Sequence, residues 1–311
     1  MQISLPWTAI NRQMLLGQRG RVAIRRRVPW IAVMVALSVG GLAHGAVAQM
    51  AQLVISGARL YASPTSSPMD KATIIIRHGK IAEIRADQRA VPVPTERMIE
   101  AEGLVVMAGF WNCHVHFTQS IWNDASDLSE ADLNAYLSAM LTRYGFTSVV
   151  DTGSNLANTQ AIRKRIDLGV KGPQILMASG SFVPENGSPA YLRVKLPELI
   201  DVKQAQQQAR QVLARGADAI KLFTGSFLGP SNTALMSLPL IAAVAQEAHQ
   251  QGKLVLAHPQ SRQGVERALE GGVDVLVHTA PTGALGPIPW LSDWSVAAWG
   301  WCQRSSSGGL S

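Results

Sequence analysis

Gly216-Ala-Asp-Ala-Ile-Lys-Leu-Phe-Thr-Gly225 is the stretch from which the fold can be predicted. It opens on a glycine that follows a helical segment and continues as an almost wholly apolar run. Glycine is a common left-handed residue after a helix, and strands that are apolar on both faces are typical of a parallel sheet covered by helices. The same order of helix, glycine and apolar strand recurs after residue 109, so the sequence predicts an α/β fold.

About six such strand–helix units follow one another. Strands are predicted at 110–116, 147–151, 174–178, 219–223, 254–258 and 273–278, and helices at 129–144, 157–168, 198–215, 239–251 and 262–270. Ser129-x-x-Asp132 resembles a capping box at the start of the first helix. A closed (β/α)8 barrel needs eight units, so we expect an incomplete TIM-like barrel.

A small β unit precedes the barrel, with short β-rich runs near 53–60, 72–77, 80–84 and 97–101. His78-Gly79 lies between two of them and predicts a hairpin turn with an exposed histidine. The predicted organisation is a signal peptide at 1–48, a small β domain at 49–108 that is part of a β-sandwich, the barrel at 109–282, and an aberrant, disordered tail at 283–311.

The first 48 residues hold six arginines and no acidic residue, and an apolar run at roughly 30–42 precedes Ala46-Val-Ala48. This order predicts a cleaved export signal and a location in the periplasm or outside the cell. The run is shorter than the about 20 residues of a membrane span, so no stable span is expected after cleavage; an uncleaved anchor is the alternative.

The rest of the chain is nearly neutral, with 22 basic and 21 acidic residues. A nucleic-acid-binding protein needs a basic face, so no nucleic-acid partner is expected. Export leads to an oxidising compartment, yet the chain has two cysteines. Cys113 lies between candidate metal ligands and Cys302 lies in the tail, so no structural disulfide is expected. The oligomeric state stays open.

Four histidines and one lysine lie at or near the ends of the predicted strands: His114, His116, Lys221, His258 and His278. The carboxyl ends of barrel strands carry the chemistry of the fold. His114 and His116 are two apart on one strand, so both project to the same side. Imidazole and oxygen ligands suit Zn²⁺ and also Mn²⁺, Fe²⁺ or Ni²⁺. Together these residues predict a site for two divalent metal ions, most simply zinc.

Lys221 is expected to be chemically modified at this site. An ammonium group facing two cations would be repelled, so the amine is expected to be neutral there. A neutral amine takes up CO₂ to form a carbamate, whose two oxygens can bridge two metals. The alternative is a lysine that reaches solvent from the strand end.

Other titratable residues are not expected to bind the metals. His249 is expected on the surface of a helix, and Asp274 at the amino end of its strand. Asp151 either orients a ligand or makes a turn before Gly153. Cys113 alternates with the two histidines and is expected to point away from the metals.

Gly109-Phe-Trp-Asn-Cys-His-Val-His116 resembles the strand-1 signature of the amidohydrolase superfamily, in particular of imidazolonepropionase-like and prolidase-like members. The stretch 216–225 resembles the carboxylated-lysine strand of that family, and His258 and His278 match the ligands of its strands 5 and 6. The resemblance covers roughly residues 52–282. It implies that the 51–108 segment is the N-terminal part of the small β-sandwich.

The resemblance also implies a mechanism. His114 and His116 hold the more buried metal, His258 and His278 hold the more exposed one, and carboxylated Lys221 bridges them. A metal-bound hydroxide then attacks the carbonyl of an amide or cyclic amide, in a non-peptide molecule or a dipeptide. An aspartate at the end of strand 8 acts as the general base in the family.

No strand 7 or 8 is predicted in this sequence. Instead, four tryptophans crowd the tail, at 290, 294, 299 and 301, and no apolar strand leads into Asp293. We therefore expect a truncated or frameshifted copy with impaired activity. The unpaired edges of an incomplete barrel favour aggregation, so poor solubility is also expected.

Two other functions stay open, a non-catalytic metal-binding remnant and a phosphotriesterase-like hydrolase. A long loop is predicted at 181–197, beside the substrate pocket. Its Tyr191 and Arg193 are candidate contacts for a substrate carboxylate; an ordinary surface loop is the alternative.

Overall fold

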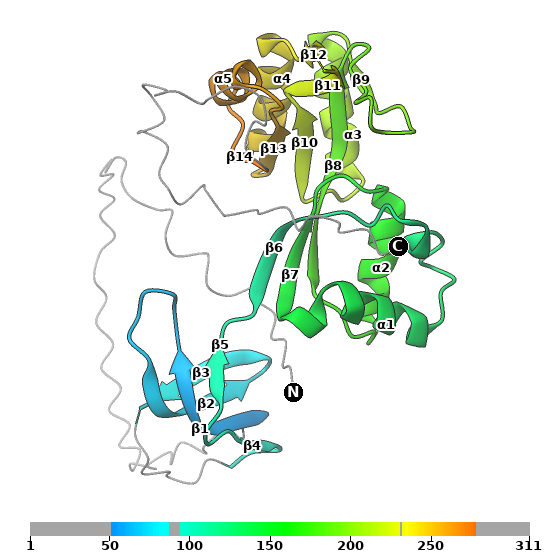
Figure 1. Ribbon diagram of the computed structural model, residues 1–311. Helices are drawn as coiled ribbons and strands as arrows, with labels where there is room; N and C mark the ends of the chain where they lie inside the picture. Colours follow the sequence, from blue (N-terminus) through cyan, green and yellow to red (C-terminus); the bar gives the residue numbers. More distant parts are fainter. Residues whose placement is uncertain (1–50, 87–93, 231, 278–311) are drawn as a thin grey trace, which may run out of the picture. The chain divides into compact units, whose positions relative to one another are not determined.

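The computed structural model describes residues 51–86, 94–230 and 232–277, which form two compact units divided between Ala108 and Gly109 (Figure 1). The predicted signal peptide, His278 and the tail lie outside the described residues. None of the helices in the described ranges is long and apolar enough to cross a membrane.

The first unit is a small sheet built around β1 (Leu53–Tyr61). This strand runs antiparallel to β2 (Met69–Arg77) and parallel to both β4 (Met98–Glu100) and β5 (Val105–Met107), and β3 (Lys80–Arg85) pairs with β2. His78 and Gly79 join β2 to β3 with φ values of 51° and 69°, which is the conformation that a two-residue type I′ turn requires. The predicted hairpin and the exposure of His78 are confirmed.

The second unit contains a parallel sheet of six main strands. They are β6 (Phe110–Val115), β7 (Phe146–Asp151), β8 (Gln174–Pro184), β10 (Ala219–Phe223), β13 (Leu254–His258) and β14 (Val275–Leu276). Their order across the sheet is their order along the chain, as in a barrel. The curled sheet with its helices confirms the prediction of an incomplete TIM-like barrel (Figure 1).

Five α-helices connect these strands: α1 (Glu130–Met140), α2 (Leu156–Asp167), α3 (Val202–Ala214), α4 (Leu238–Gln250) and α5 (Arg262–Glu270). The Ser129 side chain caps α1 by accepting a hydrogen bond from the Asp132 amide, as predicted. The glycines after α2, α3, α4 and α5 that precede the next strand all have positive φ. Helix α3 begins later than predicted because Glu198–Leu199 forms a short strand, β9, beside β8.

Two layers of apolar side chains show which way each strand faces. The layer between sheet and helices includes Val149, Ile175, Met177, Ile220, Leu222, Val255 and Ala257. The opposite, inner face carries Val150, Ala178, Ala219, Leu256 and Val275. Because side chains alternate along a strand, Lys221 and Phe223 share the inner face with Ala219, and His258 shares it with Leu256.

Two segments differ from the prediction. Strand β8 continues to Pro184 and so takes up the first residues of the predicted 181–197 loop. After β10 the chain forms an antiparallel hairpin of β11 (Gly225–Gly229) and β12 (Asn232–Leu235). The sequence of this hairpin has little apolar alternation, so its pairing depends on the surrounding structure rather than on a local pattern.

Candidate metal centre

Lys221 and His258 lie on neighbouring strands of the inner face. Strands β10 and β13 pair in parallel, with Lys221 opposite Leu256 and Phe223 opposite His258. Lys221 is 2% exposed and His258 is 7% exposed. The parallel register therefore brings a buried amine and a buried imidazole to the same end and the same face of the sheet. A lysine that reaches solvent, the alternative considered from the sequence, does not fit this burial.

Phe223 contacts both of these side chains. Its ring stacks on the His258 ring with centroids 4.7 Å apart and an interplanar angle of 24°. The Lys221 Nζ lies 5.6 Å from the centroid of the same ring. Sequence reasoning missed this residue, although its position two residues after Lys221 places it on the same face.

His114 and His116 come together at the end of β6. Their Nε2 atoms are 3.1 Å apart. The Nδ1 atom of His114 lies 3.1 Å from the carbonyl oxygen of Val277, and a carbonyl can only accept. Nδ1 therefore carries the hydrogen, which leaves the Nε2 lone pair of His114 directed toward His116. Val277 immediately precedes His278 in the sequence.

Gln260 holds His258 in a defined orientation. Its Oε1 lies 3.1 Å from His258 Nε2, so Nε2–H donates to this oxygen and the lone pair of the ring is on Nδ1. Gln260 is buried and has a φ of 53°. A hydrogen bond from the second ring nitrogen is the usual way in which proteins orient a metal-binding histidine.

The donor set fits a metal site. Two nitrogens that each lie about 2.0–2.1 Å from one zinc ion are at most about 4 Å apart, and the 3.1 Å between the two Nε2 atoms satisfies this limit. No group of three or more His, Cys, Asp or Glu side chains in the described ranges is arranged to hold an ion. Lys221 is not one of these residue types, and His278 lies outside the described ranges.

A β-bulge lies beside Lys221. In the pairing of β8 with β10, Ser179 is opposite Ile220 and Phe182 is opposite Leu222. Lys221 therefore faces two residues, Gly180 and Ser181, whose φ values are 99° and 45°. Bulges often redirect side chains next to active sites.

Comparison with known proteins identifies the family. The sequence model of the amidohydrolase family matches residues 105–296, which is more than half of the chain. The chain belongs to the amidohydrolase family. No curated protein matches this amidohydrolase.

Several solved structures share its fold. Phenylurea hydrolase B has a TM-score of 0.63 and 20% identity over 79% of this chain and 63% of its own. A putative prolidase from Bifidobacterium longum has a TM-score of 0.60 and 25% identity over 73% of this chain and 54% of its own. A prolidase crystallised with N-methylphosphonate-L-proline has a TM-score of 0.58 and 23% identity over 72% of this chain and 60% of its own. The amidohydrolase chain thus spans roughly three fifths of the length of these relatives.

Asp151 of the amidohydrolase faces the helices rather than the inner face. It is 2% exposed and accepts hydrogen bonds from the amide and hydroxyl of Ser154 and from the hydroxyl of Thr159. Desolvation by burial raises the pKa of this carboxyl above its usual value, although the hydrogen bonds oppose the shift. Of the two roles considered for Asp151, the contacts show the turn before Gly153 and none of them reaches a candidate ligand directly.

The two candidate substrate residues lie on the surface. Tyr191 is 56% exposed and Arg193 is also exposed. The loop that carries them contacts the β11–β12 hairpin through a hydrogen bond from the Ala190 amide to the Phe227 carbonyl. Their role in substrate binding stays a prediction.

His249 and Asp274 have the structural roles that were expected. His249 is exposed on α4, and its Nε2 lies 2.9 Å from a carboxylate oxygen of Asp274. The same oxygen accepts a hydrogen bond from the Val255 amide at the amino end of β13. Both residues therefore lie at the opposite end of the sheet from the candidate ligands.

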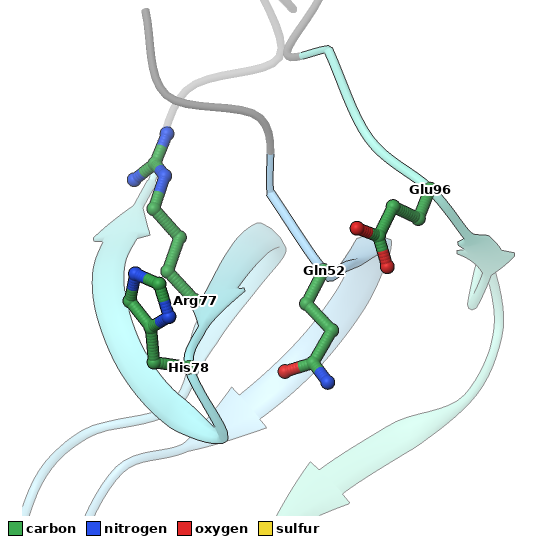
Figure 2. A pocket seen from close by; sticks show the side chains of 4 residues that line it. All are labelled: Gln52, Arg77, His78 and Glu96. Carbon is green, nitrogen blue, oxygen red and sulfur yellow. The ribbon is translucent and has the colours of Figure 1, made fainter.

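The small β unit has a polar cavity of its own, of about 180 Å³, lined by Gln52, Arg77, His78 and Glu96 (Figure 2). Gln52 accepts a hydrogen bond from the Gly79 amide through its Oε1, so one wall of the cavity supports the hairpin turn. Three of the four residues are exposed, which is typical of a surface hollow.

Proposed function

We propose that this amidohydrolase chain supplies a two-metal site for the hydrolysis of carbon–nitrogen bonds in small molecules. The substrate classes are dipeptides, with Xaa-Pro dipeptides first, and cyclic amides. The observation that carries the proposal is the buried Lys221 on the inner face, one strand from His258. The prolidases among the similar structures favour the dipeptide class.

Each candidate ligand has a distinct part in this proposal. His114 and His116 would hold one ion, and His258 and His278 would hold the second. Lys221, once carboxylated by CO₂, would supply further oxygen ligands. When bound, the ions provide Lewis-acid activation of the amide carbonyl and of the attacking water. The preferred ion is zinc, and manganese, iron or nickel also suit these ligands.

The surrounding residues prepare the ligands. The Val277 carbonyl and the Gln260 side chain fix the tautomers of His114 and His258. Lys221 is almost fully buried, with its amine over the Phe223 ring, and the same ring stacks on His258. A water-free environment disfavours the charged ammonium form of lysine, and carboxylation requires the neutral amine.

The test is a zinc titration of the full chain in bicarbonate buffer, with hydrolysis assays on an Xaa-Pro dipeptide, a cyclic amide and a phosphotriester. Loss of a residue that supports a metal ligand costs about 10–100-fold in metal affinity, so loss of the proposed ligand itself in His116→Asn should cost at least about 100-fold. The matched control, His249→Asn, alters an exposed histidine on α4 and should bind zinc like the wild type.

The outcomes separate the candidate functions. Two bound ions with dipeptide or cyclic-amide hydrolysis support the proposal. Two bound ions without hydrolysis identify a metal-binding protein that lacks catalysis. Hydrolysis confined to the phosphotriester assigns a different reaction to the same site. A wild-type chain that binds no divalent ion refutes the proposal.

A further inference from the structure

A buried hydrogen-bonded cluster lies at the carboxyl end of β7, outside the proposed set of ligands. Asp151, Ser154 and Thr159 are 2%, 9% and 0% exposed. Ser154 Oγ donates to Asp151 Oδ1 at 2.7 Å, and Thr159 Oγ1 on α2 donates to Asp151 Oδ2, also at 2.7 Å. The carboxylate therefore joins the β7 end to α2.

The same cluster reaches the strand that carries the candidate histidines. The Phe117 amide donates to Ser154 Oγ at 2.7 Å. A backbone N–H can only donate, so Ser154 Oγ must accept this bond and direct its own hydrogen to an acceptor. Asp151 Oδ1 is that acceptor. A directed chain of hydrogen bonds therefore runs from Phe117 through Ser154 to the buried carboxylate.

The residue on the other side of His116 is also tied to β7. The Thr152 amide donates to the Val115 carbonyl at 3.0 Å, and Thr152 Oγ1 lies 3.4 Å from His116 Nε2. Val115 and Phe117 flank His116 directly. Val115 and Phe117 are thus hydrogen-bonded to Thr152 and Ser154, just past the end of β7, while β6 itself ends at Val115. The backbone at His116 lies beyond the last pairing of β6 with β7. The bonds made by Val115 and Phe117 therefore restrain it where the sheet no longer does.

We propose that Asp151 and Ser154 are positioning residues for His116. They act through the Phe117 amide and hold the imidazole where its Nε2 meets that of His114. The inference rests on the proposed metal site and deepens it, because it names the residues that set the geometry of one ligand. Thr159 has a different part, since it ties the carboxylate to α2 and does not contact Phe117 in the chain of bonds described above.

The structure offers a matched pair of variants. Ser154→Ala and Thr159→Val each remove one hydroxyl that donates to the same carboxylate, and only Ser154→Ala removes the acceptor of the Phe117 amide. Zinc affinity is measured on the full-length chain by competition with a chelator, and the Co²⁺ absorption spectrum reports the ligand geometry. Hydrogen exchange of the Phe117 amide in the metal-free chain reports the anchoring directly.

We expect Ser154→Ala to weaken zinc binding by about 10–100-fold, the usual cost of losing a supporting residue of a metal ligand. It should also shift the Co²⁺ spectrum and speed exchange of the Phe117 amide. Thr159→Val should keep the wild-type affinity and spectrum, and Ser154→Thr, which retains the hydroxyl, should restore both. If Ser154→Ala does not fold, Ser154→Cys keeps a weak donor and acceptor and should show a partial loss of affinity.

Two results would overturn the inference. Equal zinc affinities for Ser154→Ala and Thr159→Val, with wild-type binding intact, would show that the cluster has a purely structural role while the proposed function stands. A wild-type chain that binds no zinc would overturn the proposed function and this inference together.

Discussion

Replacing Phe223 with leucine should weaken metal binding at the His258 side of the site. The phenyl ring stacks on His258 and covers the amine of Lys221. Leucine keeps an apolar side chain in the same buried place but has no ring face. His258 then keeps its hydrogen bond to Gln260 and loses the flat surface that restricts rotation of its imidazole.

The size of the effect follows from the contacts that are lost. A stacked aromatic pair contributes about 0.5–1.5 kcal/mol beyond its burial, and the neutral Lys221 amine adds no cation–ring attraction to this sum. Phe223 is 7% exposed, so little of the lost volume can be replaced by solvent. The free energy of unfolding should fall by about 0.5–1.5 kcal/mol, which corresponds to a drop in Tm of about 1–6 °C for a unit of this size.

Thermal unfolding and zinc titration of Phe223→Leu test this reasoning, with Phe182→Leu as the matched control. Phe182 is 1% exposed and belongs to the layer between sheet and helices, so its replacement should lower Tm without changing zinc affinity. Phe223→Leu should lower both, with the affinity reduced about 10-fold for the ion proposed to bind His258 and His278. The reasoning is refuted if Phe223→Leu binds zinc like the wild type, or if both variants lose affinity equally.

Two further predictions concern buried titratable groups. Burial raises the pKa of Asp151 above 3.8 in the folded state, so the native chain keeps this proton at pH values where the unfolded chain releases it. The free energy of unfolding therefore falls as pH rises from about 3.8 through the folded pKa, by about 1.4 kcal/mol per pH unit. Asp151→Asn should remove this part of the slope in denaturant titrations of the metal-free chain; identical slopes in both proteins would contradict it. Lys221→Met should reduce zinc stoichiometry from two ions to one, measured by elemental analysis, because the bridging carbamate is lost, whereas Lys203→Met on the exposed face of α3 should leave two.

The second unit was the most predictable part of the chain. Its strands are apolar on both faces, and a glycine lies between most of them and the preceding helix. Both patterns are local in the sequence and can therefore be recognised without the structure. The pairing of β10 with β13 follows from the same pattern, because consecutive units of a parallel barrel lie side by side. The meeting of His114 with His116 also follows from spacing alone, since two residues of separation place both side chains on one face.

Other features depend on contacts that no local pattern reveals. The β11–β12 hairpin begins at Gly225, where an added Cβ would lie 2.3 Å from the Pro259 carbonyl oxygen. The glycine is therefore required by a backbone 34 residues away in the sequence. Gln260 contacts His258 with a left-handed φ, and glutamine is not among the residues that commonly adopt this conformation. The Ser154 anchor of Phe117 likewise joins residues 37 positions apart.

The bulge in β8 allows Ala178 to face the inner layer and Phe182 to face the helices on the same strand. Ala178 lies in the inner layer and Phe182 in the layer facing the helices, although residues four apart on a regular strand point to the same side. The extra residue at Gly180 and Ser181 inverts the alternation. Phe182 can then fill the helix-facing core, while the two residues opposite Lys221, Gly180 and Ser181, are both small.

This inversion has a conformational cost. Ser181 adopts a φ of 45°, and a non-glycine residue in that region costs on the order of 1 kcal/mol or more. Such strain is retained where the surrounding structure requires it, and it is common at functional sites. A straight β8 would avoid the cost but would turn Phe182 inward, toward the face that carries Lys221. The strained serine is therefore best explained by the need to keep a large side chain away from the amine that we propose to be carboxylated.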